Sequence, residues 1–289
     1  METFELKYFL GVARSENIHK ASEELHVSPG SLSKAISRLE DELSVKLFSR
    51  EGRNIKLTDQ GRLLQKRASE IVQLEESTRL EISGVKGSIQ VIMAGSEVLL
   101  GHWGVEFTEK IKTKFPLSSF EFQGSNDAEA LEKVKSGDAH LAIITSDIPT
   151  GGELSAKILG ETKFKTYLSE NHPLYKKVKN KKPISVHEVL EHSFVSPSHP
   201  LLGKVGVKQS LDGWRDDQFP RKIEFLTSSL KILEGLVKSG KAIAYLPEYF
   251  GSNLNLVEIK ITDCPYSCTQ KIRVVARRPK DLGWLNQIF

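Results

Sequence analysis

The stretch "SPGSLSKAISRLEDEL", residues 28–43, decides how the N-terminal part of this chain is interpreted. Ser28 is a favoured helix N-cap, and Pro29 suits the first helical position, where a missing N–H has no partner inside the helix anyway. Leucine and isoleucine then recur at helical spacing, so one face is apolar, while small hydroxyls, a lysine and an arginine occupy the other. The stretch therefore predicts an amphipathic helix with a polar, uncrowded outer face.

Two shorter helices are predicted before this one, and a hairpin after it. Apolar residues at helical spacing mark residues 4–15, and Asn17 caps a second short helix. The segment "KLFSREGRNIKLT", residues 46–58, contains two short extended runs around a Glu-Gly pair, which predicts a hairpin. Three helices and a hairpin together predict a winged helix-turn-helix domain over residues 1–58.

A long helix is predicted over residues 59–84, capped by Thr58. Alternating steps of four and three along it are a coiled-coil spacing, which predicts a linker helix used for dimerisation. Residues 85–88 break the helix and are expected to form a hinge. The positions that carry the spacing are Leu64, Ala68, Ile71, Glu75, Thr78 and Ile82.

Beyond the hinge, strand-like runs alternate with helix-like runs over residues 89–289. This alternation predicts an α/β domain with a mainly parallel sheet. Its length predicts two α/β subdomains with a cleft between them. We place subdomain I at about residues 89–160 and 267–289, and subdomain II at about residues 161–266.

Composition and charge narrow the class of protein. The chain has 289 residues, 39% hydrophobic and 27% charged, as in folded globular proteins. The N-terminus does not resemble a signal peptide, and no apolar run approaches the roughly 20 residues of a membrane span, so we expect a cytoplasmic location and no membrane partner. The first 58 residues hold nine Lys and Arg against nine Asp and Glu. Any attraction to nucleic acid must therefore come from where the charges lie.

The N-terminal pattern "LKYFLGVARSENIHKASEELHVSPGSLSKAISRLEDELSVKLFSREGRNIKLTDQG", residues 6–61, resembles the LysR-type bacterial transcription regulators. The segments "LEKVKSGDAHLAIIT", "ENHPL" and "LVKSGKAIAYLP" are similar to the effector-domain signatures of that family, in the expected order. The sequence departs from the family pattern at Ser22, where the second Ala of a pair is usual, at Ser44, where a Gly is common, and at His19 and Lys20, where small polar residues are common. The resemblance implies a sequence-specific regulator that binds a double-stranded DNA operator as a homodimer or dimer of dimers, with RNA polymerase as a further partner. It implies no catalytic residue, cofactor or metal.

In this family the third helix is expected to enter the major groove and the wing to reach the minor groove or the backbone. Small hydroxyls let the helix approach closely, and longer basic side chains reach guanine edges or phosphates. The expected DNA contacts are Ser28, Pro29, Gly30, Ser31, Ser33, Lys34, Ser37 and Arg38 on the helix, and Arg50 and Arg53 in the wing. The expected structural residues are Ala21, Leu25, Leu39 and Phe48 in the core, and Glu40 as a partner within the helical unit.

The C-terminal domain is expected to resemble periplasmic binding proteins and to hold a small-molecule effector between its subdomains. Such sites use strand ends and helix N-termini, where free N–H groups favour polar or anionic groups. Glu97 beside Ser96 opposes an anion, so no acid is named as the effector. The expected effector residues are Gly95, Ser96, Gly124, Ser125, Asn126, Thr145, Ser196, Pro197, Ser198 and Thr227.

Three other functions are alternatives to this interpretation. An enzyme is disfavoured because "HEVLEH" places its second histidine at i+5 rather than the i+4 of a zinc-protease helix. A solute-binding protein is opposed by the N-terminal DNA-binding pattern and by the absence of a signal peptide. Cys264 and Cys268 leave a thiol sensor open, although two unreactive thiols are the simpler interpretation.

Overall fold

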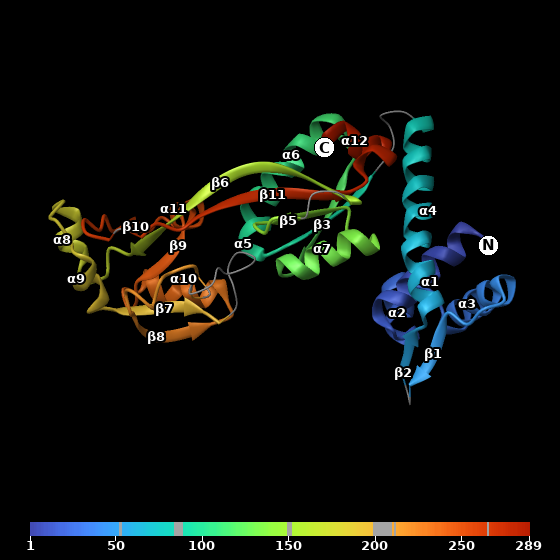
Figure 1. Cartoon of the computed structure of the whole chain (residues 1–289), viewed down its shortest axis with the longest axis horizontal. Coiled ribbons are helices and arrows are strands. Elements are labelled where there is room, and N and C mark those ends of the chain that lie inside the picture. The colour runs from blue at the N-terminus through green and yellow to red at the C-terminus, as the bar shows by residue number, and fades with distance from the viewer. Residues whose placement is uncertain (52–53, 84–88, 149–151, 199–209, 211, 265) are drawn as a thin grey trace.

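The computed structural model of the chain describes all residues except 52–53, 84–88, 149–151, 199–209, 211 and 265 (Figure 1). The hinge expected at residues 85–88 and the wing residue Arg53 therefore lie outside the described residues.

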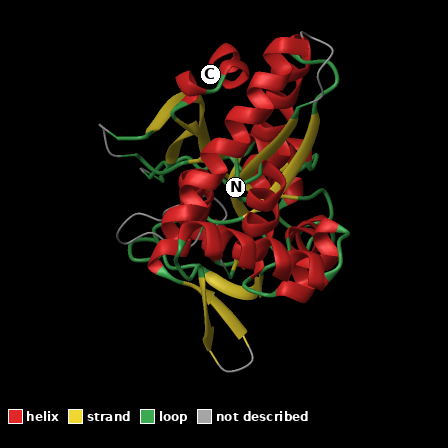
Figure 2. Ribbon diagram, turned by 90° about the vertical axis from the view of Figure 1, so that its right-hand side faces the viewer, coloured by secondary structure: helices red, strands yellow, loops and turns green. Residues whose placement is uncertain are grey.

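The N-terminal domain is a winged helix-turn-helix, as predicted. Strands β1 and β2 pair antiparallel and project beyond the helices (Figure 2). The core expected here is confirmed in part, because Ala21 and Leu39 are fully buried while Leu25 and Phe48 are half-buried against the core. The elements are α1 (Thr3–Ser15), α2 (Ile18–Leu25), α3 (Pro29–Leu43), β1 (Phe48–Glu51) and β2 (Asn54–Leu57).

Helix α3 begins and ends at residues suited to cap a helix. The Ser28 hydroxyl accepts a hydrogen bond from the Ser31 N–H at 3.1 Å, and Pro29 occupies the first turn. Ser44 ends the helix in the left-handed region, with φ of 53°. Leu32 and Leu39 are fully buried, and each such side chain contributes about 1.5–3 kcal/mol of stabilisation.

The long helix α4 (Asp59–Ser83) is capped by Thr58, whose hydroxyl accepts from the Gly61 N–H at 3.0 Å. The coiled-coil seam expected along it is wrong at its start. Leu64 and Ala68 pack into the winged-helix core, and Ala68 is fully buried. These two positions are used inside the chain because α1 packs against α4.

The C-terminal domain consists of two α/β lobes, which we call subdomain I and subdomain II (Figure 1). In subdomain I, β3 pairs in parallel with both β4 and β5. Its elements are β3 (Gln90–Gly95), α5 (Glu97–Leu99), the π-helical turn η2 (Leu100–Gly104), α6 (Val105–Lys114), β4 (Ser119–Gly124), α7 (Asp127–Ser136), β5 (Leu141–Ile144), η3 (Pro279–Asp281) and α12 (Gly283–Ile288).

Subdomain II contains a second parallel pair, β7 with β8, and its described residues include four short or medium helices. Its elements are α8 (Tyr175–Lys179), α9 (Val186–Leu190), β7 (Ser193–Pro197), β8 (Lys222–Thr227), α10 (Leu230–Lys238), β9 (Ala244–Pro247), α11 (Glu248–Asn253) and β10 (Val257–Glu258).

Two long strands connect the subdomains: β6 (Leu154–Leu168) and β11 (Thr269–Arg277). They pair antiparallel and cross from one lobe to the other (Figure 1). In addition, β6 pairs antiparallel with β9 and β10, and β11 with β5. The sheet is therefore mixed, whereas the sequence pattern predicted a mainly parallel one. The reason is that a chain that passes to a second lobe and returns must run in both directions.

None of the helices in the described part of the chain combines the length and the apolar character needed to cross a membrane.

Candidate functional site

The outer face of α3 is the first candidate site. Seven of its eight expected DNA contacts are exposed, and Pro29 is half-buried at the start of the helix. The opposite face holds the buried residues Leu32, Ala35, Ile36 and Leu39. Helix α3 and the hairpin β1–β2 lie at the end of the molecule away from subdomain II (Figure 1). A double helix can therefore reach this face.

The first turn of α3 is open. A Cβ atom added at Gly30 would meet no atom nearer than the Ser28 hydroxyl, at 3.9 Å. Packing within the chain therefore does not require glycine at this position, whereas a surface that closely approaches a nucleic acid would favour it. The hydroxyls of Ser28 and Ser31 lie 2.9 Å apart and form a polar pair at this end.

The basic residues of the two elements differ in their surroundings. Lys34 is exposed and has no ion-pair partner among the described residues. Arg38 is 58% exposed, and its guanidinium lies 3.8 Å from the carboxylate of the buried Glu5, so this side chain is partly held by its own domain. Arg50 is exposed on β1, whereas Arg53 falls among residues 52–53, which are not described. Lys34 is thus the freest cation on the α3 face.

Glu40 has the structural role expected of it. Its carboxylate accepts from the N–H groups of Leu47 and Phe48 at 2.8 and 3.3 Å, and pairs with Lys46 at 2.6 Å. Burial opposes ionisation, but these hydrogen bonds outweigh it and lower the pKa of Glu40. The residue ties the end of α3 to the start of the wing.

The second candidate site begins at the carboxyl ends of three strands in subdomain I. The register places Gly95 beside Gly124 and Ile143, and the Ser125 N–H donates to the Gly95 carbonyl at 2.9 Å. The structure thus gathers six of the expected effector residues at one edge of the sheet. They are Gly95, Ser96, Gly124, Ser125, Asn126 and Thr145.

Several of these side chains already have local partners. Ser96 caps α5, and Asn126 caps α7 by accepting from the Glu129 N–H at 3.0 Å. Gly95 serves packing, because a Cβ there would lie 2.5 Å from the Ile143 carbonyl oxygen. Gly124 is different, since nothing lies within 4 Å of its Cβ position. The open part of this edge is therefore largely backbone.

Sequence reasoning missed Asp127, the residue that organises this edge. It is only 4% exposed, and one carboxylate oxygen accepts from the N–H groups of Thr145 and Ser146 at 3.0 and 2.7 Å. Arg273 also donates to the Thr145 carbonyl at 2.9 Å. The signal in the sequence was an acidic residue directly after a capping asparagine, which resembles an ordinary helix start.

The remaining expected effector residues form a second cluster at the ends of β7 and β8. Pro197 pairs with Thr227, and the Ser198 N–H donates to the Thr227 carbonyl at 2.9 Å. Ser196 and Pro197 are buried, and Ser198 is exposed. Figure 1 draws β7 and β8 with their arrowheads toward subdomain I. The ten residues therefore form two groups, one at the strand ends of each lobe.

An aromatic contact between the lobes was also missed. His102 of η2 stacks on Tyr249 of α11 with ring centroids 4.5 Å apart, and Trp103 meets Tyr249 edge-on at 6.0 Å. Trp103 also covers Gly160 on β6, where a Cβ would lie 2.3 Å from the indole. π-Helical turns often occur at functional positions, but nothing in the spacing of these residues predicts that they meet.

The two cysteines are free thiols. Cys268 is buried, and burial raises the pKa of its thiol, which disfavours the reactive thiolate. Within the described ranges, no three His, Cys, Asp or Glu side chains are grouped so that they could hold a metal ion.

Comparison with known proteins identifies a family for each of the two domains. Residues 4–62 match the family model of the bacterial regulatory helix-turn-helix proteins of the lysR family, and residues 90–283 match that of the LysR substrate binding domain. The uncharacterized HTH-type transcriptional regulator YybE of Bacillus subtilis is 27% identical over 100% of this chain and 94% of its own length.

Two solved structures share the fold over the whole chain. Full-length LysG from Corynebacterium glutamicum, with bound effector Arg, is 18% identical with a TM-score of 0.60. The match covers 100% of this chain and 96% of LysG. Full-length CbnR in complex with its target DNA is 17% identical with a TM-score of 0.60 and is covered to 98%. With both family models matched in order along the chain, this protein belongs to the LysR family of DNA-binding transcriptional regulators, with an effector-binding domain behind its helix-turn-helix domain.

Proposed function

We propose that this regulator recognises its operator through the outer face of α3 and the wing, and that a small molecule held between the two strand-end clusters alters how it grips that DNA. The observation that carries the proposal is the exposed, small-residue face of α3 with the unpaired Lys34. In this proposal residues 1–58 bind DNA, residues 59–84 link and dimerise, and residues 89–289 bind the effector in the cytoplasm.

The proposed DNA contacts are assigned by the length of each side chain. The hydroxyls of Ser31, Ser33 and Ser37 meet base edges or phosphates, and Lys34 and Arg38 extend further. The N–H groups at the start of α3, around Ser28, Pro29 and Gly30, meet a phosphate. Arg50 and Arg53 contact the adjacent minor groove or backbone.

Self-association is part of the proposal, as a homodimer or a dimer of dimers. The exposed residues Leu63, Ile71, Leu74 and Ile82 follow one side of α4, at 62%, 39%, 55% and 83% exposure. Exposed apolar side chains spaced in this way along a helix favour a partner helix. RNA polymerase is proposed as a further partner, on the family resemblance alone.

The effector site is proposed to take a polar molecule. Gly124, Ser125 and Ser198 offer backbone and hydroxyl groups from opposite lobes, which suits a ligand that bridges them. The exposed carboxylate of Glu97 stands next to Ser96 and disfavours anions. LysG is described with bound arginine, so amino acids, arginine among them, belong in the first panel of candidates.

The test begins with chromatin immunoprecipitation of the full chain, followed by DNase footprinting of the recovered DNA with and without the candidate panel. We expect an extended footprint whose length or spacing changes with one ligand, because effector binding alters the angle between subdomains. A footprint limited to one short half-site and indifferent to every ligand contradicts the proposal.

Two substitutions separate the roles on α3. Lys34→Ala should weaken binding to all sequences and reduce the salt slope by about one unit, since it removes one phosphate contact. Ser33→Ala should instead change base preference, by about 1–3 kcal/mol at one position. Lys231→Ala on α10 removes the same charge from a side chain that is 87% exposed, and serves as the control. Equal salt slopes for all three variants and the unchanged protein would refute the assignment.

A further inference from the structure

The linker helix α4 is docked on subdomain I of its own chain. Residues on one side of it, at i, i+3, i+4 and i+7, form what we call the docking face. Lys66 pairs with Glu153 at 3.0 Å, and the Gln73 side-chain amide donates to the Gly137 carbonyl at 3.3 Å. The other two residues of this docking face are Ser69 and Glu70.

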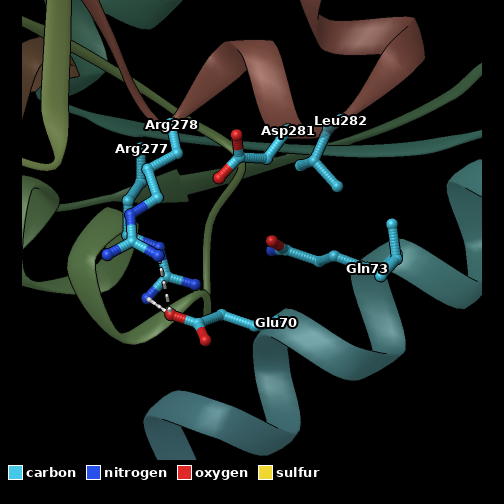
Figure 3. A pocket seen from close by; sticks show the side chains of 7 residues that line it. Glu70, Gln73, Arg277, Arg278, Asp281 and Leu282 are labelled. Carbon is cyan, nitrogen blue, oxygen red and sulfur yellow. Dashed lines mark ion pairs between the residues drawn. The ribbon is translucent and has the colours of Figure 1, made fainter.

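Charged residues of the docking face and of β11 line a small cavity between α4 and the end of β11 (Figure 3). One oxygen of Glu70 lies 3.7 Å from the Arg277 guanidinium and 3.9 Å from that of Arg278. Arg277 is only 7% exposed and also donates to the Lys135 carbonyl at 2.5 Å. Removing the Glu70 carboxylate would leave the buried charge of Arg277 with less compensation.

The C-terminal end of α7 is fitted to α4 without spare room. Gly137 ends α7 with φ of 84°, and a Cβ there would lie 1.6 Å from the Ser69 hydroxyl, which is buried. The next residue, Asp138, lies 3.5 Å from Arg14 of α1. One turn of subdomain I therefore touches both the linker helix and the DNA-binding domain.

The other end of α7 lies at the strand ends of subdomain I around Gly95, Gly124 and Thr145, which we call the effector edge because the effector is proposed to bind there. Asn126 caps the helix there, and Asp127 in its first turn holds the N–H groups of Thr145 and Ser146. Ten helical residues span about 15 Å. Strand β11 makes a second connection, because Arg273 donates to Thr145 while Arg277, four residues on, faces Glu70.

We propose that α7, supported by β11, is a rigid lever that transmits a change at the effector edge to the linker helix and the DNA-binding domain. The inference rests on the proposed function and names its mechanical route. A helix with both ends tied by buried contacts moves as a unit, so displacement of Asp127 displaces Gly137 and α4 with it. Contiguity alone does not establish coupling, whereas reciprocity between the two ends does.

The first test is hydrogen exchange on the full-length protein without DNA or ligand. Gly137→Ala should make amides 66–74 of α4 exchange about tenfold faster, because the added methyl expels Ser69. It should also change exchange of the Thr145 and Ser146 amides by about fivefold at the far end of α7. Asp127→Asn should also change exchange at both ends of α7. Its larger effect should be on the Thr145 and Ser146 amides, and its smaller effect on amides 66–74 of α4.

The matched control is Gly240→Ala. Gly240 follows α10, has a φ of 74°, and would meet the Asn171 backbone at 2.5 Å, yet it lies in subdomain II. It should leave both reporter regions unchanged. If Gly137→Ala affects only α4 and its own turn, with Thr145 and Ser146 as in the unchanged protein, the lever is refuted.

If Gly137→Ala does not fold, the charges of the ion pair between Arg14 and Asp138 can be swapped instead. Arg14→Asp and Asp138→Arg should each loosen amides 66–74, and the double variant should restore their protection. Failure of the double variant to restore protection would contradict the proposed contact between α7 and the DNA-binding domain. A chain that shows this coupling but gives no ligand-dependent footprint would overturn the proposed function and leave the lever standing.

Discussion

At the scale of single residues, buried polar groups do more than the sequence pattern suggests. Glu40 and Asp127 are each nearly inaccessible, and each accepts two backbone N–H groups that would otherwise lack partners. Removing an acceptor from a buried donor costs more than the bond itself contributes. These carboxylates therefore fix the geometry of the winged helix and of the strand ends in subdomain I.

Replacing Glu40 tests this role in the winged helix. Glu40→Gln should lower the free energy of unfolding by about 1–3 kcal/mol, because an amide replaces a charge-assisted acceptor and loses Lys46. Urea denaturation followed by circular dichroism measures it. Asp41→Asn changes an exposed neighbour and should have little effect. Since the pKa of Glu40 is lowered on folding, its contribution is present above the unfolded pKa and is lost as pH falls through the folded one.

Two histidines predict a loss of stability in mild acid. Burial lowers the pKa of both His140 and His172 to about 4. The unfolded chain binds protons near pH 6.5 and the folded chain does not, so stability falls as pH drops from 6.5 toward 4.

His172→Asn isolates one of these two contributions. The asparagine oxygen can replace the ring nitrogen that accepts from the Leu174 N–H at 3.2 Å, without titrating. The variant should lose about 1–3 kcal/mol less than the unchanged protein between pH 7 and pH 4.5, measured by urea denaturation. His187→Asn alters an exposed ring and is the matched control. An unchanged pH dependence in His172→Asn would contradict the assignment.

At the scale of elements, α3 and α4 differ in how far their sequence specifies their use. Helix α3 has one buried face and one exposed face, as its pattern predicts. Helix α4 has three faces: one in the winged-helix core, one docked on subdomain I, and the stripe Leu63, Ile71, Leu74 and Ile82. A spacing of four and three cannot distinguish these faces, which is why Leu64 and Ala68 were misassigned.

The stripe predicts the effect of a charge on self-association. Ile71→Glu should weaken the dimer by about 2 kcal/mol, roughly thirtyfold in dissociation constant, because it places a charge in an apolar contact. Analytical ultracentrifugation measures the constant. Gln60→Glu, in the first turn of the same helix and outside the stripe, is the control. A dissociation constant unaffected by Ile71→Glu would place the dimer contact elsewhere.

At the scale of the whole molecule, the relation between the subdomains depends on a few contacts at the crossing strands. Trp103 lies over Gly160 of β6 and beside Tyr249 of α11, so a residue of subdomain I touches both the connection and the other lobe. Interfaces between packed lobes change in discrete steps rather than continuously. This contact therefore helps to set the angle between the two subdomains.

Gly160→Ala should disturb that angle. The new methyl would lie 2.3 Å from the indole, so Trp103 must move, at a cost of about 1–3 kcal/mol. Small-angle scattering should show a changed shape of the full-length protein, and urea denaturation a lower stability. Gly101→Ala, in the same π-helical turn as Trp103, meets nothing within 4 Å and is the control. Identical scattering curves for the two variants would rule out this role.

The sequence by itself determined the winged helix, its caps, the polar face of α3 and the residues at the strand ends, because helix capping and periodicity act over a few residues. Only the tertiary structure decided that the sheet is mixed and that α4 docks on subdomain I. It also decided that Asp127 holds the strand ends, that Trp103 covers Gly160, and that Gly137 packs against α4. Gly137 and Ser69 are 68 residues apart, and no local preference specifies their contact. Such contacts arise from the packing of whole elements, in which each residue's role depends on surfaces distant in the chain.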